Sequence, residues 1–163
     1  VIKLLFKSMV RPILENGNIV WAPSGPGSLG IIREIEKVQR RATRMVKSIR
    51  ELSYIDRLKA LKLPSLSYRR RRGDMIEAYK RTHNGYDDNF RWLATDDNYK
   101  GLRNNGCKLV KERKQHKLKR KMFSVRMQED WKSLPPSVVN APSLNAFKDR
   151  LDLHWAHLHY EVL

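Results

Sequence analysis

The sequence is poor in cysteine: its 163 residues include one, Cys107. A lone thiol cannot form an internal disulfide, nor can it supply a multi-cysteine zinc site. Long apolar runs are missing as well, since none approaches the ~18 residues of a membrane-spanning helix, and the residues after Val1 lack signal-peptide order. We therefore expect an intracellular protein, located in the nucleus or in both nucleus and cytoplasm.

Acidic residues are also scarce, with 17 Asp and Glu against 34 Lys and Arg, which gives a formal net charge of +17. Two segments carry this excess: residues 33–72 have a net charge of +10 and residues 100–132 a net charge of +9. Such blocks attract anionic partners, of which nucleic acid is the commonest and an anionic membrane surface the next.

The spacing of apolar residues predicts a mainly α-helical chain, a multi-helix bundle of about five to six helices with a basic arm and irregular loops. A chain of this size, with 40% hydrophobic residues, is expected to form a single domain. The start and stop signals place helices at residues 1–14, 28–50, 53–62, 65–83, 123–134 and from 143 onward. Residues 18–21 are a short apolar stretch, and residues 22–27, rich in Gly and Pro, read as a loop.

The helix expected over residues 28–50 has two contrasting faces. Its apolar face, predicted to enter the core, consists of Ile31, Ile35, Val38, Ala42, Met45 and Ile49. The opposite face is a basic stripe of Arg33, Lys37, Arg40, Arg44 and Lys47. Cations at one-turn spacing can follow a phosphate backbone, so we expect nucleic-acid contact. The alternatives are a solvated face and contact with a membrane or a partner helix.

Four consecutive arginines, Arg69, Arg70, Arg71 and Arg72, span a full helical turn, so they cannot all point outward. A buried guanidinium needs a partner, which is either an internal carboxylate or a bound phosphate. Asp74 and Glu77 project toward Arg70, and this favours phosphate for at least one of Arg69 and Arg72. The basic arm adds further candidate contacts at Lys117, Lys119, Arg120 and Lys121.

Three groups of residues resemble catalytic or metal sites. The acidic pair in Tyr86-Asp87-Asp88 follows Asn84-Gly85 and reads as a surface turn rather than a polymerase metal site. The imidazoles of His154, His157 and His159 lack nearby Cys or Asp ligands. Cys107 has basic neighbours but no identifiable histidine partner. We expect no catalytic residue, metal, cofactor or small-molecule substrate in this chain.

Ordered motifs along the whole chain resemble one family. They include LFKSMVRPILENG at residues 5–17, VWAP at 20–23, EKVQRRAT at 36–43 and RGDMIEAYK at 72–80. Further matching positions are residues 52–54, 57–58, 63–66, 68–70, 123–126, 131, 134–135, 138–139, 141–143 and 147–148. Together they resemble the segment that follows the polymerase core of non-LTR retrotransposon (LINE, jockey-like) reverse transcriptases.

The resemblance implies a helical thumb and C-terminal region that grips RNA, DNA or an RNA/DNA template-primer. An upstream palm, carrying the catalytic aspartates before Val1, would be its protein partner. The chain would then be a non-catalytic segment of a longer RNA-directed DNA polymerase, and a start at Val1 inside an amphipathic pattern agrees with this. We expect a thumb-like bundle over residues 1–99, with the arm and two C-terminal helices over 100–163 packed on the same domain.

Two other functions fit the same residues. The chain could be a structural module whose basic surface docks on an acidic protein and never meets nucleic acid. It could also be a domesticated or relic fragment of the element. Nothing in the sequence places side chains against base edges, so sequence-specific readout is not expected.

Overall fold

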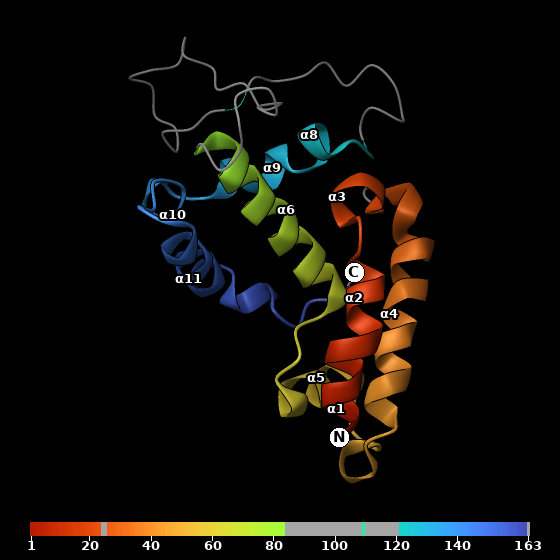
Figure 1. Ribbon diagram of the computed structural model, residues 1–163. Coiled ribbons are helices and arrows are strands. Elements are labelled where there is room, and N and C mark those ends of the chain that lie inside the picture. The colour runs from red at the N-terminus through yellow and green to blue at the C-terminus, as the bar shows by residue number, and fades with distance from the viewer. Residues whose placement is uncertain (24–25, 84–108, 110–120, 163) are drawn as a thin grey trace. The chain divides into compact units, whose positions relative to one another are not determined.

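The computed structural model describes residues 1–23, 26–83, 109 and 121–162 (Figure 1). Within these ranges the secondary structure is helical and contains no strand, which confirms the predicted mainly α-helical, multi-helix fold. No helix in the described ranges is both long and apolar enough to cross a bilayer.

The chain opens with a helical segment whose middle turn is wider than an α-helix. It consists of α1 (Ile2–Leu5), a π-helical turn (Phe6–Val10) and α2 (Arg11–Glu15). The wide turn ends at Val10, two residues before Pro12, which has no N–H to donate to the preceding turn. Gly17 then ends the segment in the left-handed conformation, at φ +64°. The short apolar stretch that follows is helical and forms α3 (Asn18–Trp21).

The basic stripe lies on α4 (Leu29–Arg44), which follows a short 3-10 turn at Pro26–Ser28. This helix ends earlier than the predicted Arg50, and a separate 3-10 turn at Lys47–Ile49 carries the end of the stripe. Helix α5 (Tyr54–Leu61) is capped by Ser53, whose hydroxyl accepts the Asp56 N–H at 3.2 Å.

The longest helix, α6 (Leu66–Thr82), begins next to the chain's C-terminal segment. The Ser65 N–H donates to the His159 carbonyl at 2.9 Å, and the Ser65 hydroxyl donates to the Glu161 carbonyl at 2.7 Å. His159 also hydrogen-bonds the Tyr68 hydroxyl, with 2.8 Å between Nε2 and the oxygen. These contacts hold the last described residues against the start of α6.

The other described helices lie between residues 123 and 158, at the end of the second basic block and after it. They are α8 (Phe123–Arg126), α9 (Gln128–Ser133), α10 (Pro136–Val139), α11 (Leu144–His154) and a 3-10 turn (Ala156–Leu158). Phe147 and Leu151 form the buried face of α11, and Trp155, directly after this helix, is buried as well. Tyr79 of α6 stacks on Phe147 with ring centroids 4.3 Å apart, and Trp131 lies 6.2 Å from the same ring.

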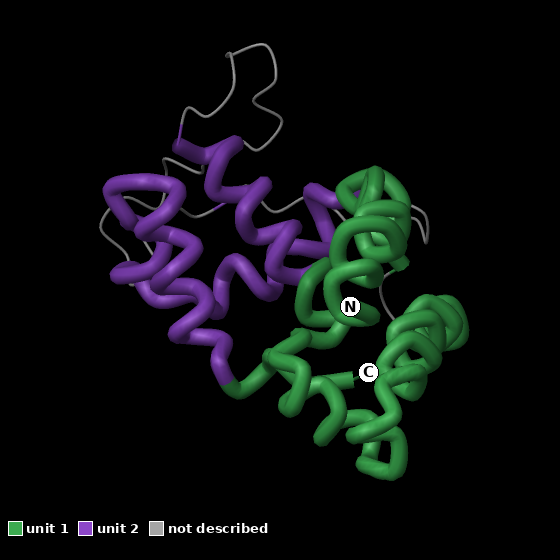
Figure 2. The backbone as a smooth tube through the Cα atoms, turned by 60° about the horizontal axis from the view of Figure 1, so that its bottom comes forward, with its two compact units in different colours: residues 1–70, 157–163 green, residues 71–156 purple. Residues whose placement is uncertain are grey.

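Contacts group the chain into two compact units, coloured in Figure 2. One consists of residues 1–70 with 157–163, and the other of residues 71–156. Helix α6 runs from the first into the second. The boundary expected near residue 99 lies outside the described residues.

Candidate nucleic-acid interface

The buried face of α4 is mostly polar, and this corrects the predicted core face. Ile32, Glu36, Gln39 and Thr43 are 5% exposed or less. The expected core residues Ile31, Val38 and Met45 are instead 54%, 39% and 63% exposed. The helix therefore presents three faces: a buried polar one, with the basic stripe on one flank and a partly exposed apolar face on the other.

Partners from a distant stretch of sequence explain why polar side chains are buried here. The Glu36 carboxylate accepts the Leu66 N–H at 3.3 Å on Oε1 and 3.1 Å on Oε2. Because Leu66 is the first residue of α6, this carboxylate lies at a helix N-terminus, where negative charge is favoured. Gln39 Nε2 donates to the Pro64 carbonyl at 2.9 Å. The polar face thus joins α4 to the chain segment between α5 and α6.

Arg57 of α5 is a buried cation that sequence analysis did not single out. It is 3% exposed; its Nε donates to Thr43 Oγ1 at 3.2 Å and its Nη1 to the Leu52 carbonyl at 2.5 Å. No carboxylate within the described ranges forms an ion pair with it. Burial, reinforced by the charge of Arg44, lowers the pKa of Arg57. A buried positive charge therefore lies next to α4, inside the compact unit that contains residues 1–70.

Tyr54 connects this interior to the basic stripe. Its hydroxyl donates to Glu36 Oε1 at 2.6 Å, and burial, together with the negative charge of Glu36, raises the pKa of Tyr54. The guanidinium of Arg40 lies 4.8 Å from the centre of its ring, and that of Arg57 lies 5.7 Å from it. Two guanidinium groups thus contact one aromatic ring, a favourable arrangement for cations.

The stripe itself is exposed, as predicted. Arg33, Lys37, Arg40 and Arg44 are exposed on α4, and Lys47 is exposed on the following 3-10 turn. Lys37 forms an ion pair with Glu34, with 2.5 Å between Nζ and Oε1, and both side chains are largely in solvent. Among the described residues, no other member of the stripe has a carboxylate partner. The row therefore offers charge that the fold does not neutralise.

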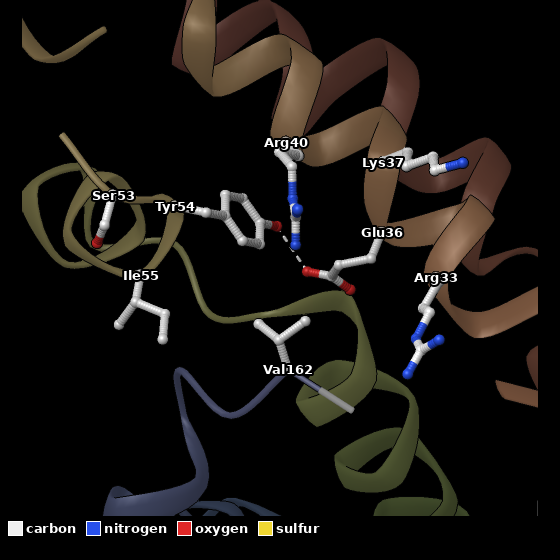
Figure 3. Close-up of a pocket in the computed structure, with 8 residues that line it drawn as sticks. All are labelled: Arg33, Glu36, Lys37, Arg40, Ser53, Tyr54, Ile55 and Val162. Carbon is white, nitrogen blue, oxygen red and sulfur yellow. Dashed lines mark hydrogen bonds between the residues drawn. The ribbon is translucent and has the colours of Figure 1, made fainter. Parts of the chain in front are cut away.

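A pocket of about 510 Å³ opens beside the stripe. Its lining residues are Arg33, Glu36, Lys37, Arg40, Ser53, Tyr54, Ile55 and Val162 (Figure 3). Figure 3 shows the Tyr54 ring beside Arg40, with its hydroxyl directed at the Glu36 carboxylate. The walls thus combine cations from α4 with apolar side chains from α5 and from the C-terminal segment.

The arginine cluster on α6 makes internal ion pairs, which corrects the preference for phosphate at Arg69 or Arg72. Arg69 forms a two-pronged pair with Glu15, with 2.7 Å between Nη2 and Oε2. Arg72 pairs in the same way with Asp152, at 2.5 and 2.7 Å. The sequence argument weighed only nearby acids, whereas these two lie 54 and 80 residues away.

The other two arginines of the cluster are also engaged. Arg71 pairs with Asp130 at 3.0 and 2.7 Å, and its guanidinium lies 5.3 Å from the Trp155 ring centre. Arg70 is buried, and its Nη2 lies 3.4 Å from the Ser67 hydroxyl. Asp74, expected near Arg70, accepts both prongs of Arg126 at 2.9 and 2.8 Å. Three of the four arginines are therefore paired with carboxylates of other helices.

The remaining candidates are only partly described. Lys121 is exposed, whereas Lys117, Lys119 and Arg120 lie outside the described residues, as do Tyr86-Asp87-Asp88 and Cys107. His159 is occupied by Tyr68, and His154 and His157 are exposed. Within the described ranges, no group of three or more His, Cys, Asp or Glu side chains is placed to hold a metal ion.

No family model, curated protein or solved structure matched the chain in the three comparisons made. The resemblance to non-LTR retrotransposon reverse transcriptases therefore rests on the motifs of the sequence itself.

Proposed function

We propose that this chain is a non-catalytic, nucleic-acid-binding segment of a retrotransposon-type RNA-directed DNA polymerase. It holds RNA, DNA or an RNA/DNA template-primer through contacts between the basic stripe and phosphates. The observation that carries the proposal is the contrast between two arginine-rich surfaces. Three of the four arginines of the α6 cluster pair with carboxylates from elsewhere in the fold, whereas the stripe on α4 stays exposed and almost unpaired.

The geometry of the stripe suits a phosphate backbone. Arg33, Lys37, Arg40 and Arg44 follow one another at steps of four, three and four residues, which corresponds to rises of about 4.5 to 6 Å. The four span about 16 Å of helix, and Lys47 extends the row. Guanidinium groups bind phosphate in two-pronged fashion, and three of the five members are arginines. Such contacts position a duplex without reading its sequence.

Buried Arg57 increases the positive electrostatic potential of the same surface. It adds positive charge next to Arg40 and Arg44 that no described carboxylate cancels. A cation held at low dielectric acts over a longer distance than one in water, so it raises the potential at the stripe. The motifs shared with reverse transcriptases suggest that an upstream palm supplies the chemistry. We therefore expect residues 1–163 alone to bind a template-primer without extending it.

A binding assay with matched variants tests the proposal. We would titrate a fluorescent RNA/DNA hybrid with the wild-type chain and with a variant in which all five stripe residues are Gln. The control variant removes the same charge from five exposed positions elsewhere: Lys7, Arg50, Lys59, Lys62 and Lys132. Loss of affinity in the stripe variant alone supports the proposal. Equal losses in both variants would mean that binding depends on the overall net charge of the chain and not on the stripe.

One observation favours a second function, docking on a protein. The apolar flank of α4 is exposed at Ile31, Val38 and Met45, and Leu4, Met9 and Ile13 of the opening segment are 64% exposed or more. Apolar side chains gathered on one surface often mark protein contacts. If the wild-type chain binds none of the RNA, DNA and hybrid probes at low salt, the docking function is the better explanation.

A further inference from the structure

The pocket beside the stripe is lined by both charged and apolar side chains, and contacts with phosphate alone would not involve the apolar ones. Its lining includes the cations of α4 on one side, and Ile55 and Val162 provide apolar surface across from them. The carboxylate of Glu36, which is 2% exposed, also lines the pocket. An anion is therefore attracted by the exposed cations of the lining and repelled by the buried Glu36 carboxylate.

We propose that this pocket receives one unpaired nucleotide of a strand bound along α4, so the inference rests on the proposed function. The phosphate stays at the rim, next to Arg33 and Arg40, while the uncharged base enters and lies against Ile55 and Val162. A volume of about 510 Å³ falls within the range of small-ligand pockets and accommodates a single nucleotide. A base pair inside a duplex cannot enter, because its base is held in the stack.

The apolar wall is fixed by the fold. Val162 comes from the C-terminal segment, which Ser65 and Tyr68 hold through the hydrogen bonds to His159 and Glu161. Ile55 lies in the first turn of α5, directly after Tyr54, whose hydroxyl is bonded to Glu36. Both walls of the pocket therefore belong to one compact unit and are anchored by described contacts.

The polarity of the pocket also favours a nucleotide over a bare anion. Inorganic phosphate would gain only the rim cations, which the stripe offers along its whole length. A base gains contact with apolar side chains that are otherwise exposed to water, since Ile55 is 44% exposed. Selectivity for unpaired over paired nucleotides follows, and it needs no contact with base edges.

Two duplexes of equal phosphate number test the inference, one blunt and one with a short single-stranded overhang. The variant is Ile55→Ser, and the matched control is Leu52→Ser, because Leu52 is also 44% exposed but does not line the pocket. We expect Ile55→Ser to weaken binding of the overhang duplex about fivefold and to leave the blunt duplex unchanged. Leu52→Ser should change neither. Equal effects on both duplexes, or no effect of Ile55→Ser on the overhang duplex, would overturn the inference.

A mononucleotide titration separates this inference from the proposed function. With methyl-labelled wild-type chain, AMP should shift the resonances of Ile55 and Val162, whereas ribose 5-phosphate, which lacks the base, should leave both unchanged. If the stripe variant loses duplex binding but AMP leaves both methyl groups unshifted, the proposed function stands and the pocket inference fails. If the chain binds neither duplex nor AMP, both fail.

Discussion

The Tyr54 hydroxyl donates to Oε1 of Glu36 at 2.6 Å, joining the first turn of α5 to the buried face of α4. The same carboxylate receives the first N–H of α6. One acidic side chain therefore fixes three helices around the surface that carries the basic stripe. Because burial and the charge of Glu36 raise the pKa of Tyr54, the hydroxyl stays a donor throughout the physiological pH range.

Replacing Glu36 by Gln should destabilise the chain by about 1 to 3 kcal/mol, because an uncharged amide with one acceptor oxygen replaces a carboxylate that accepts both the Leu66 N–H and the Tyr54 hydroxyl. Urea unfolding followed by circular dichroism measures the loss. The matched control is Glu34→Gln on the exposed side of α4, expected within about 0.5 kcal/mol of wild type. Equal stability of the two variants would contradict the role assigned to Glu36.

Replacing Arg72 by Met should leave Asp152 without its two-pronged partner and lower stability by about 1 to 2 kcal/mol. The loss is smaller than for a fully buried pair because both side chains are partly open to water. Arg69→Met should act similarly through Glu15, again measured by urea unfolding. Neither variant should weaken affinity for a hybrid duplex by more than twofold or so, since removing one peripheral charge has a small effect.

If Arg72→Met or Arg69→Met instead stabilises the free chain and abolishes duplex binding, the arginine cluster is a phosphate site after all. Arg41→Met is the control for charge removal, because Arg41 is exposed on α4 and no described carboxylate pairs with it.

The arginine cluster on α6 shows which contacts can be predicted from sequence and which cannot. A full turn of arginines indicates that some must point inward, and that part of the interpretation follows from helical geometry. Their partners, Glu15, Asp130 and Asp152, lie in other helices, and nothing local in the sequence links them to α6. The choice between carboxylate and phosphate therefore required the tertiary structure.

Lowering the pH should destabilise the chain through His83. Burial lowers the pKa of His83, which stacks on Tyr79 with ring centroids 4.1 Å apart. The unfolded chain then binds a proton more readily than the folded one. Stability is full above the ordinary histidine pKa of about 6.5 and is lost as the pH falls through the lowered value.

Thermal unfolding of wild type and His83→Gln between about pH 7.5 and 5 measures this effect. The variant should lose less stability than wild type over this interval, because it cannot take up the proton. His154→Gln is the control, since His154 is exposed. Identical pH profiles for wild type and His83→Gln would refute the prediction.

Local signals were enough for several elements and misleading for α4. Ser53 and Ser143 cap their helices through side-chain oxygens, and the Phe147 and Leu151 face is buried, as spacing predicts. On α4 the apolar residues suggested one core face, but the buried positions also include Glu36 and Gln39. Their spacing with Ile32 and Thr43 is equally helical. Only the donors and acceptors at Pro64 and Leu66 make that polar face the stable one.

The exposed apolar flank of α4 offers a further check. Replacing Val38 and Met45 by Gln should leave the helix intact, since Gln is a good helix former and both side chains are exposed. Affinity for the hybrid duplex should stay within about twofold of wild type, because neither residue belongs to the stripe. Fluorescence anisotropy measures the affinity. A loss of binding comparable to that of the stripe variant would mean that the nucleic acid contacts the apolar flank of α4, contrary to the proposal.

The most direct test of the central claim is the salt dependence of affinity for an RNA/DNA or DNA duplex. Counterion release gives a slope of log K against log salt of about −0.9 for each phosphate neutralised on B-form DNA, so five stripe cations predict a slope of about −4 to −5. Replacing Arg33, Lys37, Arg40, Arg44 and Lys47 by Gln should flatten the slope while helicity is retained. A wild-type slope near zero, or a steep slope that survives these five substitutions, would contradict the account.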